Sequence, residues 1–235
     1  MLRIEETDSV RVVTLDRPNA RNALTLDGLD ALGTAVADAD VPVVLVRGVG
    51  DAFCAGADLA TVAKAATDGT AADAFVERGQ RTMRRIETSD AAVVAGVDGA
   101  ARGGGVELAL ACDVRVATPD ATFAEPGVTF GLFGAWGGTV RLPEAVGTSH
   151  AADLSLSGRV VDAETAREMG LVSRVVSDPR TVADELADND ADALRTLSDL
   201  LTRRGDSGER EAAERAAFVD LLTERAEALA RHRKE

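Results

Sequence analysis

Apolar segments rich in β-branched residues are each followed by a glycine turn and then by a helical pattern. Val43–Val46 is an unbroken apolar run that ends at a pair of glycines, and helical sequence follows from about Asp58. Ala92–Ala95 is a similar run, followed by a glycine-rich segment over 96–105 and by helical sequence over 106–111. Continuous apolar runs are typical of strands buried on both faces. Because such strands alternate with helices, the sequence predicts an α/β fold.

The remaining elements continue this alternation. Residues 2–15 predict two short strands that stop at a turn over 16–19, and Thr25 is a suitable N-cap for a helix with Leu26, Leu29, Leu32 and Val36 on one face. Further predicted elements are a helix over 72–88, short strands over 114–116 and 122–123, a helix over 163–169 and a strand over 171–176.

The carboxyl-terminal part differs in composition. Beyond Asp178 aromatic residues nearly vanish, charge rises and helical periodicity dominates. We place a soft boundary near 178–185, which divides the chain into a core of residues 1–180 and a helical region of residues 181–235. A helical tail with little core of its own must pack on the main body or on another subunit.

The formal net charge of −14 argues against two classes of partner. A surface this acidic repels phosphate backbones and anionic lipid heads, so we expect neither nucleic-acid nor membrane binding. Only Lys64 and Lys234 are lysines, and the many Asp and Ala residues suggest a salt-adapted protein, although an ordinary acidic protein is the alternative. The amino terminus has no apolar signal-peptide core and no apolar run reaches membrane-spanning length, which predicts a cytoplasmic protein.

No motif for a metal, a nucleotide or a nucleophilic serine is complete. Cys54 and Cys112 have no neighbouring histidine, which argues against zinc, and two cysteines are too few for a disulfide framework. No Gly-Lys-Ser/Thr follows Gly103–Gly105, and Ser149 lacks the second glycine of a nucleophile elbow. We therefore expect no metal and no bound cofactor.

Two glycine-containing segments have the same arrangement, in which a strand is followed by a turn and then by a helix. Phe53–Leu59 and Gly103–Glu107 each follow a strand and open a helix, where backbone N–H groups have no intrahelical acceptor. Glycines there remove the Cβ that would block a ligand oxygen. Two such turns side by side can stabilise one carbonyl oxygen that becomes negative. The alternative is that both glycine turns serve only tight packing.

Several long motifs occur in the order found in one enzyme family. Over residues 2–176 the chain closely resembles the crotonase (enoyl-CoA hydratase/isomerase) superfamily, through Asp16–Leu24, Ala52–Leu59, Gly103–Asp113, Gly137–Leu142 and Ser157–Val172. The resemblance implies a crotonase-like spiral of strand–strand–helix turns with a C-terminal helical trimerisation region. It also implies a homotrimer or a dimer of trimers, and acyl-CoA thioesters as substrates.

The resemblance further implies roles for individual positions. Ala57 and Gly104 would donate the two N–H groups to the thioester oxygen, and Glu107 matches the first of two hydratase glutamates. Backbone over 21–23 and 55–59 would line the CoA path, which makes the expected contacts Arg21, Ala23, Ala55, Asp58 and Leu59.

The second hydratase glutamate is missing. Its position is Gly127, whereas Glu125 lies two residues earlier and on the same side if the segment is extended. Glu125 is therefore either a replacement acid or a surface or structural residue.

Four of the seven aromatic residues fall between 123 and 136, namely Phe123, Phe130, Phe133 and Trp136. They form either a core patch or an acyl pocket, in which Phe133 and Trp136 would contact substrate. The nucleophilic aspartate of the aryl-CoA dehalogenase branch would fall at Ala135, which argues against that reaction.

The sequence thus predicts an acyl-CoA enzyme, with hydration of a 2-enoyl-CoA as the first choice. Two carboxyl groups suit hydration, because one can deprotonate water while the other protonates the α-carbon. With one carboxyl group, the alternatives are double-bond isomerisation, thioester hydrolysis or decarboxylation. A non-catalytic acyl-CoA binder is the alternative outside enzymes.

Overall fold

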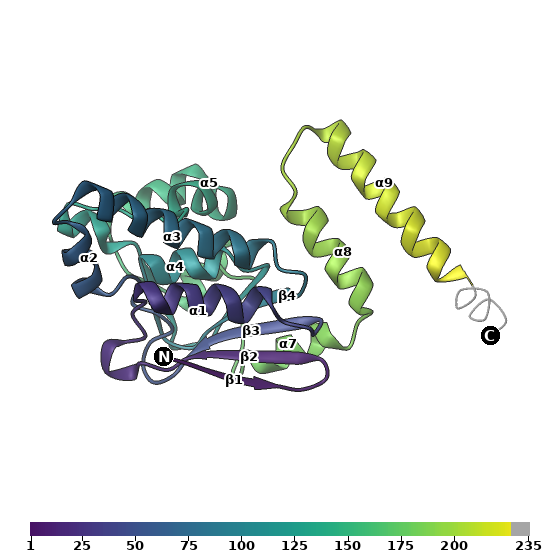
Figure 1. Cartoon of the computed structure of the whole chain (residues 1–235), viewed down its shortest axis with the longest axis horizontal. Coiled ribbons are helices and arrows are strands. Elements are labelled where there is room, and N and C mark those ends of the chain that lie inside the picture. The colour runs from purple at the N-terminus through teal and green to yellow at the C-terminus, as the bar shows by residue number, and fades with distance from the viewer. Residues whose placement is uncertain (227–235) are drawn as a thin grey trace.

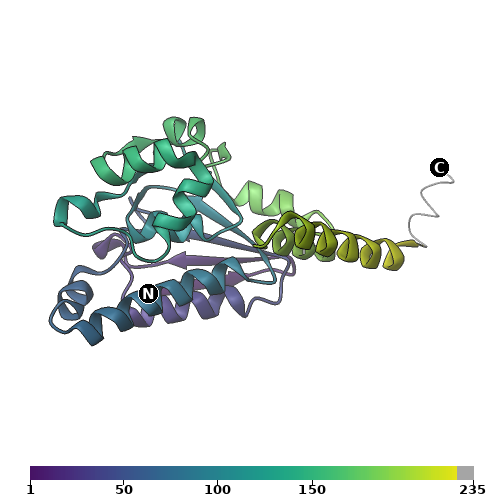
Figure 2. The ribbon, with the colours of Figure 1, turned by 90° about the horizontal axis from the view of Figure 1, so that it is seen from above.

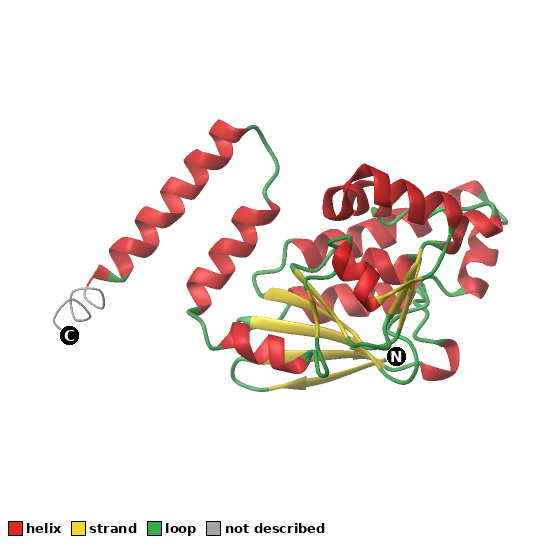
Figure 3. Ribbon diagram, turned by 180° about the vertical axis from the view of Figure 1, so that it is seen from behind, coloured by secondary structure: helices red, strands yellow, loops and turns green. Residues whose placement is uncertain are grey.

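A twisted six-stranded sheet forms the centre of the molecule. The computed structural model describes residues 1–226, and its main sheet has the strand order β1-β2-β3-β4-β6-β9 (Figure 3). β1 pairs with β2 in antiparallel fashion, and every other neighbouring pair is parallel. The strands are β1 (Leu2–Glu6), β2 (Val10–Leu15), β3 (Val43–Gly48), β4 (Ala92–Val97), β6 (Val114–Ala117) and β9 (Arg174–Val175).

Both faces of this sheet are covered, as the unbroken valine runs predict. Val44 and Val46 of β3 face the larger core beneath α1 (Leu26–Ala37) and α3 (Gly69–Glu87). Val43 and Leu45 face the smaller core beneath α7 (Arg180–Ala187), which contributes Val182 and Ala183. Figure 1 shows α1 and α3 on one side of the strands and α7 on the other. The chain is therefore α/β, with apolar side chains alternating between two cores.

A second, three-stranded sheet has the order β5-β7-β8. Its strands are β5 (Ala100–Arg102), β7 (Thr122–Ala124) and β8 (Val161–Asp162). The chain passes from β4 through β5 into α4 (Gly104–Leu110), and from β6 through β7 to a 3-10 turn, η2 (Pro126–Phe130), and then α5 (Gly138–Ser157). These two turns each take one strand from each sheet before a helix, in agreement with the predicted strand–strand–helix spiral.

The other helices are η1 (Pro18–Ala20), α2 (Leu59–Ala65) and α6 (Ala163–Glu168). The predicted cap is confirmed, since Thr25 Oγ1 accepts the N–H of Gly28 at 3.2 Å. The strand predicted over 171–176 is wrong in extent, because only Arg174–Val175 pairs as β9. The N–H groups of Leu171 and Val172 instead donate to Ala166 O, closing the end of α6.

The carboxyl-terminal helices extend away from the body. α8 (Ala191–Thr202) is joined to it by Ser198, whose hydroxyl donates to Asp113 Oδ1 at 2.6 Å. α9 (Ser207–Glu224) packs on α8 and stands clear of both sheets (Figures 1 and 2). Both helices leave apolar side chains exposed, namely Leu197, Leu201, Phe218, Val219 and Leu222.

The boundary between residues 180 and 181 remains a prediction. It falls at the start of α7, which packs on the main sheet, and the end of the predicted helical region, 227–235, lies outside the described residues. None of the helices within residues 1–226 combines the length and apolar character needed to span a bilayer. That same range holds no cluster of three or more His, Cys, Asp or Glu side chains able to bind a metal.

Candidate active site

A largely apolar cavity of about 510 Å³ opens between α2, α3, the start of α4 and the segment that follows β7. Gly103, Gly104 and Glu107 line it from the α4 side, and Glu125–Gly127 and Phe130–Trp136 line it from the β7 side. It brings together Ala57, Gly104, Glu107, Glu125 and Gly127, which are distant in the sequence. Apolar walls with a few converging polar groups are typical of ligand sites.

The Ala57 and Gly104 turns lie side by side. Gly56 has φ +86°, and a Cβ there would stand 2.9 Å from the Gly104 nitrogen, so glycine permits the close approach. Leu24 N–H donates to Gly56 O at 2.8 Å, and Asp58 N–H donates to Leu24 O at 2.9 Å. In this parallel bridge the Ala57 N–H points away from Leu24. Ala57 and Gly104 both line the cavity, and neither N–H donates to an acceptor within residues 1–226.

Glu107 is a buried carboxyl group held by backbone. It is 2% exposed, and its Oε1 accepts the N–H groups of Trp136 and Gly138, both at 2.7 Å. Burial raises its pKa, while these two amides and the charge of Arg141 oppose the rise. Arg141 itself is paired with Glu87, with Nη2 2.6 Å from Oε2. Since both hydrogen bonds go to Oε1, Oε2 keeps its acceptor capacity for a proton from a ligand.

Glu125 is also buried, at 7% exposed, which excludes the surface alternative and leaves a replacement acid or a structural residue. Its Oε1 is a buried oxygen with no hydrogen-bond partner among the described residues. Burial, and then the negative charge of Glu107, raise its pKa to about 8. The two carboxyl groups therefore share one cavity but differ in their surroundings: Glu107 accepts two backbone hydrogen bonds, whereas the surroundings of Glu125 favour its neutral form.

Gly127, the position of the absent second glutamate, is covered by the chain that follows it. A Cβ at this position would lie 2.9 Å from Phe133 Cα and 3.1 Å from Leu132 O. Leu132 N–H also donates to Gly127 O at 2.9 Å. A side chain here would require this loop to move.

The residues expected along the CoA path separate into two groups. Ala55 and Leu59 line the cavity, with the Leu59 side chain exposed. Arg21, Ala23 and Asp58 do not line it, and instead stabilise the turn. Arg21 O accepts the Ala55 N–H at 2.9 Å, Ala23 O accepts Arg17 Nη1 at 2.6 Å, and Asp58 caps α2 and pairs with Arg17 at 3.2 Å.

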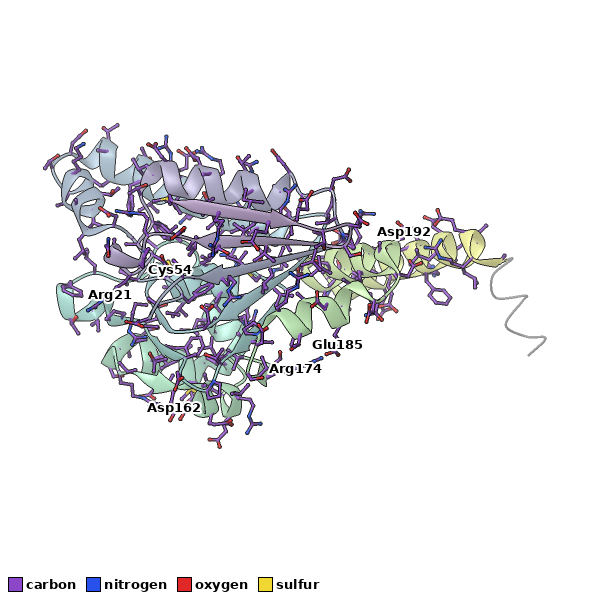
Figure 4. All side chains as sticks on the ribbon, turned by 90° about the horizontal axis from the view of Figure 1, so that it is seen from below. Arg21, Cys54, Asp162, Arg174, Glu185 and Asp192 are labelled. Atoms are coloured by element: carbon purple, nitrogen blue, oxygen red, sulfur yellow. The ribbon has the colours of Figure 1, made fainter. Side chains whose placement is uncertain are left out.

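Cys54 lies behind this turn, in the interior (Figure 4). Burial raises the pKa of its thiol to about 12. Cys54 is a buried packing residue in the neutral thiol form.

The aromatic residues between 123 and 136 divide between the two predicted alternatives, a core patch and a cavity wall. Phe123 belongs to the core, whereas Trp136 is 2% exposed and lines the cavity, with its ring centroid 5.6 Å from that of Phe75. Phe130 is exposed at the opening, as is Phe133, whose exposed fraction is 73%. The cavity thus has a buried aromatic wall and an exposed aromatic rim.

The sequence reasoning missed the wall that α2 and α3 contribute. Val62, Ala65, Phe75 and Val76 line the cavity from these helices. Their only sequence signal is apolar character within otherwise polar helical segments, and this pattern does not tell a cavity wall from a core contact.

Comparisons with known proteins place this geometry in a family. Residues 5–231 match the family described as enoyl-CoA hydratase/isomerase. A probable enoyl-CoA hydratase of Mycobacterium leprae is 36% identical over 220 residues, covering 92% of this chain and 81% of that protein. A crotonyl-CoA hydratase of Syntrophomonas wolfei is 38% identical over 178 residues, covering 74% of this chain and 68% of the relative.

Solved structures similar to this chain include enzymes named enoyl-CoA hydratase. The crystal structure of enoyl-CoA hydratase from Bacillus anthracis superposes with a TM-score of 0.90 at 30% identity, covering 99% of this chain and 96% of that one. The enoyl-CoA hydratase from Thermoplasma volcanium also gives a TM-score of 0.90 at 30% identity, with 98% and 96% covered. The crotonase-like fold is thereby confirmed. The chain belongs to the enoyl-CoA hydratase/isomerase family, and it is an enzyme of that type.

Proposed function

We propose that this enzyme hydrates a 2-enoyl-CoA thioester to a 3-hydroxyacyl-CoA. The observation that carries the proposal is the pair of unbonded N–H groups, of Ala57 and Gly104, beside the Glu107 carboxylate. Relatives named enoyl-CoA hydratase and crotonyl-CoA hydratase support the choice of reaction. Roles assigned by analogy on a shared fold require the site itself to fit, and these residues supply the required chemistry.

The two amides would hold the thioester oxygen and stabilise the negative charge that develops when water adds to the β-carbon. Loss of one such donor typically costs about 3 kcal/mol of barrier. Glu107 Oε2 would accept the proton of the attacking water, while Oε1 stays fixed by Trp136 and Gly138. The exposed neighbourhood of Arg21 and Leu59 would meet the CoA portion. The reaction needs no further cofactor, because CoA is part of the substrate.

Incubation with crotonyl-CoA tests this reaction directly. We expect loss of the conjugated-enoyl absorbance and formation of a product heavier by one water, detected by mass spectrometry. Glu107→Gln should lower kcat by about 10²- to 10⁴-fold while calorimetry shows unchanged binding of saturated butyryl-CoA. An unreactive wild-type enzyme, or an unimpaired variant, would contradict the proposal.

A second candidate is double-bond isomerisation of a 3-enoyl-CoA, favoured by the absence of a carboxyl group at Gly127. Conversion of a 3-enoyl-CoA to the conjugated isomer, without hydration, would select it. Free thiol release would indicate hydrolysis, CO₂ release would indicate decarboxylation, and binding without turnover would indicate a non-catalytic binder.

The assembly we propose is a homotrimer or a dimer of trimers. The exposed Phe218 and Leu222 of α9 and Leu201 of α8 support it, since another subunit would cover them. Sedimentation at several protein concentrations distinguishes these assemblies from a monomer. Within the same proposal the enzyme is cytoplasmic and salt-adapted, supported by its net charge of −14.

A further inference from the structure

Burial of the Glu125 carboxyl group costs solvation free energy, and no hydrogen bond to its Oε1 from the described residues compensates for this loss. An acid buried without a hydrogen bond pays the full loss of its water contacts. Glu125 Oε1 accepts no bond within residues 1–226, yet the side chain lies in the wall of the same cavity as Glu107. Buried acids that serve only to stabilise a fold are usually hydrogen-bonded. An unsatisfied buried oxygen in the wall of a ligand cavity is typical of a group with a catalytic or binding role.

The backbone places Glu125 in register with the amides. Gly103 N–H donates to Ala124 O at 3.0 Å, so Gly104 and Glu125 are the residues immediately following a bonded pair. β5 and β7 continue this pairing from Ala100 to Arg102. One short parallel ladder thus positions both the Gly104 N–H and the Glu125 carboxyl group.

The usual position of the second carboxyl group is closed at the same time. The Leu132–Phe133 backbone occupies the space in which a side chain at Gly127 would begin. The chain therefore has no carboxyl group at position 127 and has a buried one at Glu125, two residues earlier in the same cavity wall.

The groups that face Glu125 favour its neutral form. Glu107 on α4 is the charged group that acts on it. From the surrounding loop and α5, a small adjoining cavity is lined by Val128, Phe133, Gly134, Gly138, Thr139, Leu142 and Ser155, all uncharged.

Arg141, Arg102 and Asp162, which lie on elements packed against β7 and η2, are engaged elsewhere. Arg141 on α5 pairs with Glu87. Arg102 on β5 donates to the Thr122 carbonyl at 2.8 Å, and Asp162 on β8 caps α6. No cation among the described residues is therefore bonded to Glu125.

We infer that Glu125 is the proton donor of the reaction and replaces the carboxyl group that position 127 lacks. This inference rests on the proposed hydration. The water oxygen bonds to the β-carbon, and Glu107 takes one water proton. The electron pair of the C=C bond moves to the α-carbon, which takes the proton from the Glu125 O–H bond. Glu107 then holds a proton and Glu125 a negative charge, and transfer of one proton from Glu107 to Glu125 resets the pair.

Glu125→Gln is the main test, because it keeps the shape of the side chain and removes its acidic proton. We expect kcat for crotonyl-CoA to fall by about 10²- to 10⁴-fold, with unchanged Kd for butyryl-CoA. The pH profile of kcat/KM in the wild type should decline above about pH 8, and this alkaline limb should vanish in the variant. Glu125→Asp should keep the limb at reduced rate. Glu211→Gln, at an exposed residue of α9, is the matched control.

Deuterium incorporation at the α-carbon of butyryl-CoA separates this inference from the proposed function. Exchange by the wild type in D₂O that Glu125→Gln abolishes supports the inference, even if crotonyl-CoA is not hydrated. Equal exchange, or an unchanged kcat and alkaline limb in Glu125→Gln, overturns it while hydration stands. A wild type that neither hydrates nor exchanges overturns both.

Discussion

The indole ring of Trp136 lies directly against the backbone of Gly79 on α3. A Cβ at Gly79 would come within 2.1 Å of Trp136 Cδ1 and Nε1, so the ring occupies the space that a side chain at this helix position would need. The other side of the ring is close to Gly104, where a Cβ would stand 2.4 Å from Cζ3. Trp136 therefore fills the gap between α3 and α4 and limits the cavity there.

Trp136→Ala should enlarge the cavity and shift substrate preference toward longer acyl chains. The ratio of kcat/KM for a medium-chain enoyl-CoA to that for crotonyl-CoA should rise at least tenfold. The free energy of unfolding should drop by about 3–5 kcal/mol, as is typical when a large buried aromatic side chain is removed. Trp136→Phe, which keeps most of the volume, should change both quantities less. An unchanged chain-length preference in Trp136→Ala would show that the ring does not limit the acyl site.

Gly134→Ala should displace the Glu107 carboxyl group. The added Cβ would stand 2.9 Å from Cδ and 3.0–3.1 Å from the two oxygens, closer than ordinary contacts allow. Because small misplacements of reacting groups are costly, kcat should fall by about 10²-fold. Gly69→Ala is the control, since a Cβ there meets nothing within 4 Å. Equal activities of the two variants would argue against a fixed Glu107.

Glu125 should make the protein less stable as pH rises. The folded-state pKa of about 8 lies above the ordinary value of 4.5, so between these values the unfolded chain releases a proton that the folded chain retains. The free energy of unfolding therefore falls through this window and levels off above it. Glu125→Gln should lack this loss, gaining roughly 3–5 kcal/mol on wild type between pH 5 and pH 9. Denaturant unfolding at both pH values measures the difference, and parallel pH dependences would contradict it.

Salt should stabilise the protein if the acidic surface is an adaptation. At a net charge of −14, exposed carboxylates repel one another, and about 1 M salt shortens the Debye length to roughly 3 Å. Tm should therefore rise steadily from dilute buffer to molar KCl. Surface ion pairs such as Arg174–Glu185, which point toward one another in Figure 4, would weaken over the same range and limit the gain. Full activity and an unchanged Tm in dilute buffer would identify an ordinary acidic protein.

Much of the fold could be predicted because its signals are local. The valine runs of β3 and β4 and the Thr25 cap of α1 specify their elements within a few residues. α5 was not predicted as a helix, because Pro143 and Gly147, with φ +75°, interrupt any helical pattern in its sequence. Nor does the sequence of β5 differ from that of a glycine-rich turn until β7 pairs with it.

The same difference between local signals and contacts of distant segments applies to the site. The Ala57 and Gly104 turns could be predicted, since each depends on a strand, a glycine and a helix in succession. The burial of Glu125 and the closure of Gly127 could not, because the loop and α5 line the wall around Glu125 and the Leu132–Phe133 backbone covers Gly127. Arg21 and Asp58, expected beside the ligand, make backbone and capping contacts that hold the turn, and their contact with CoA stays a prediction. The catalytic and binding roles of all these residues remain predictions.

The hydrogen bond from the Gly103 N–H to the Ala124 carbonyl links the turn that holds Gly104 to the segment that holds Glu125. A slip of β7 by one residue would turn the Glu125 side chain to the opposite face, and it would break this bond at the same moment. Loosening of this ladder would therefore displace the Gly104 N–H and the Glu125 carboxyl group together. Hydrogen-exchange protection of the Gly103 amide thus reports whether Gly104 and Glu125 are held in register.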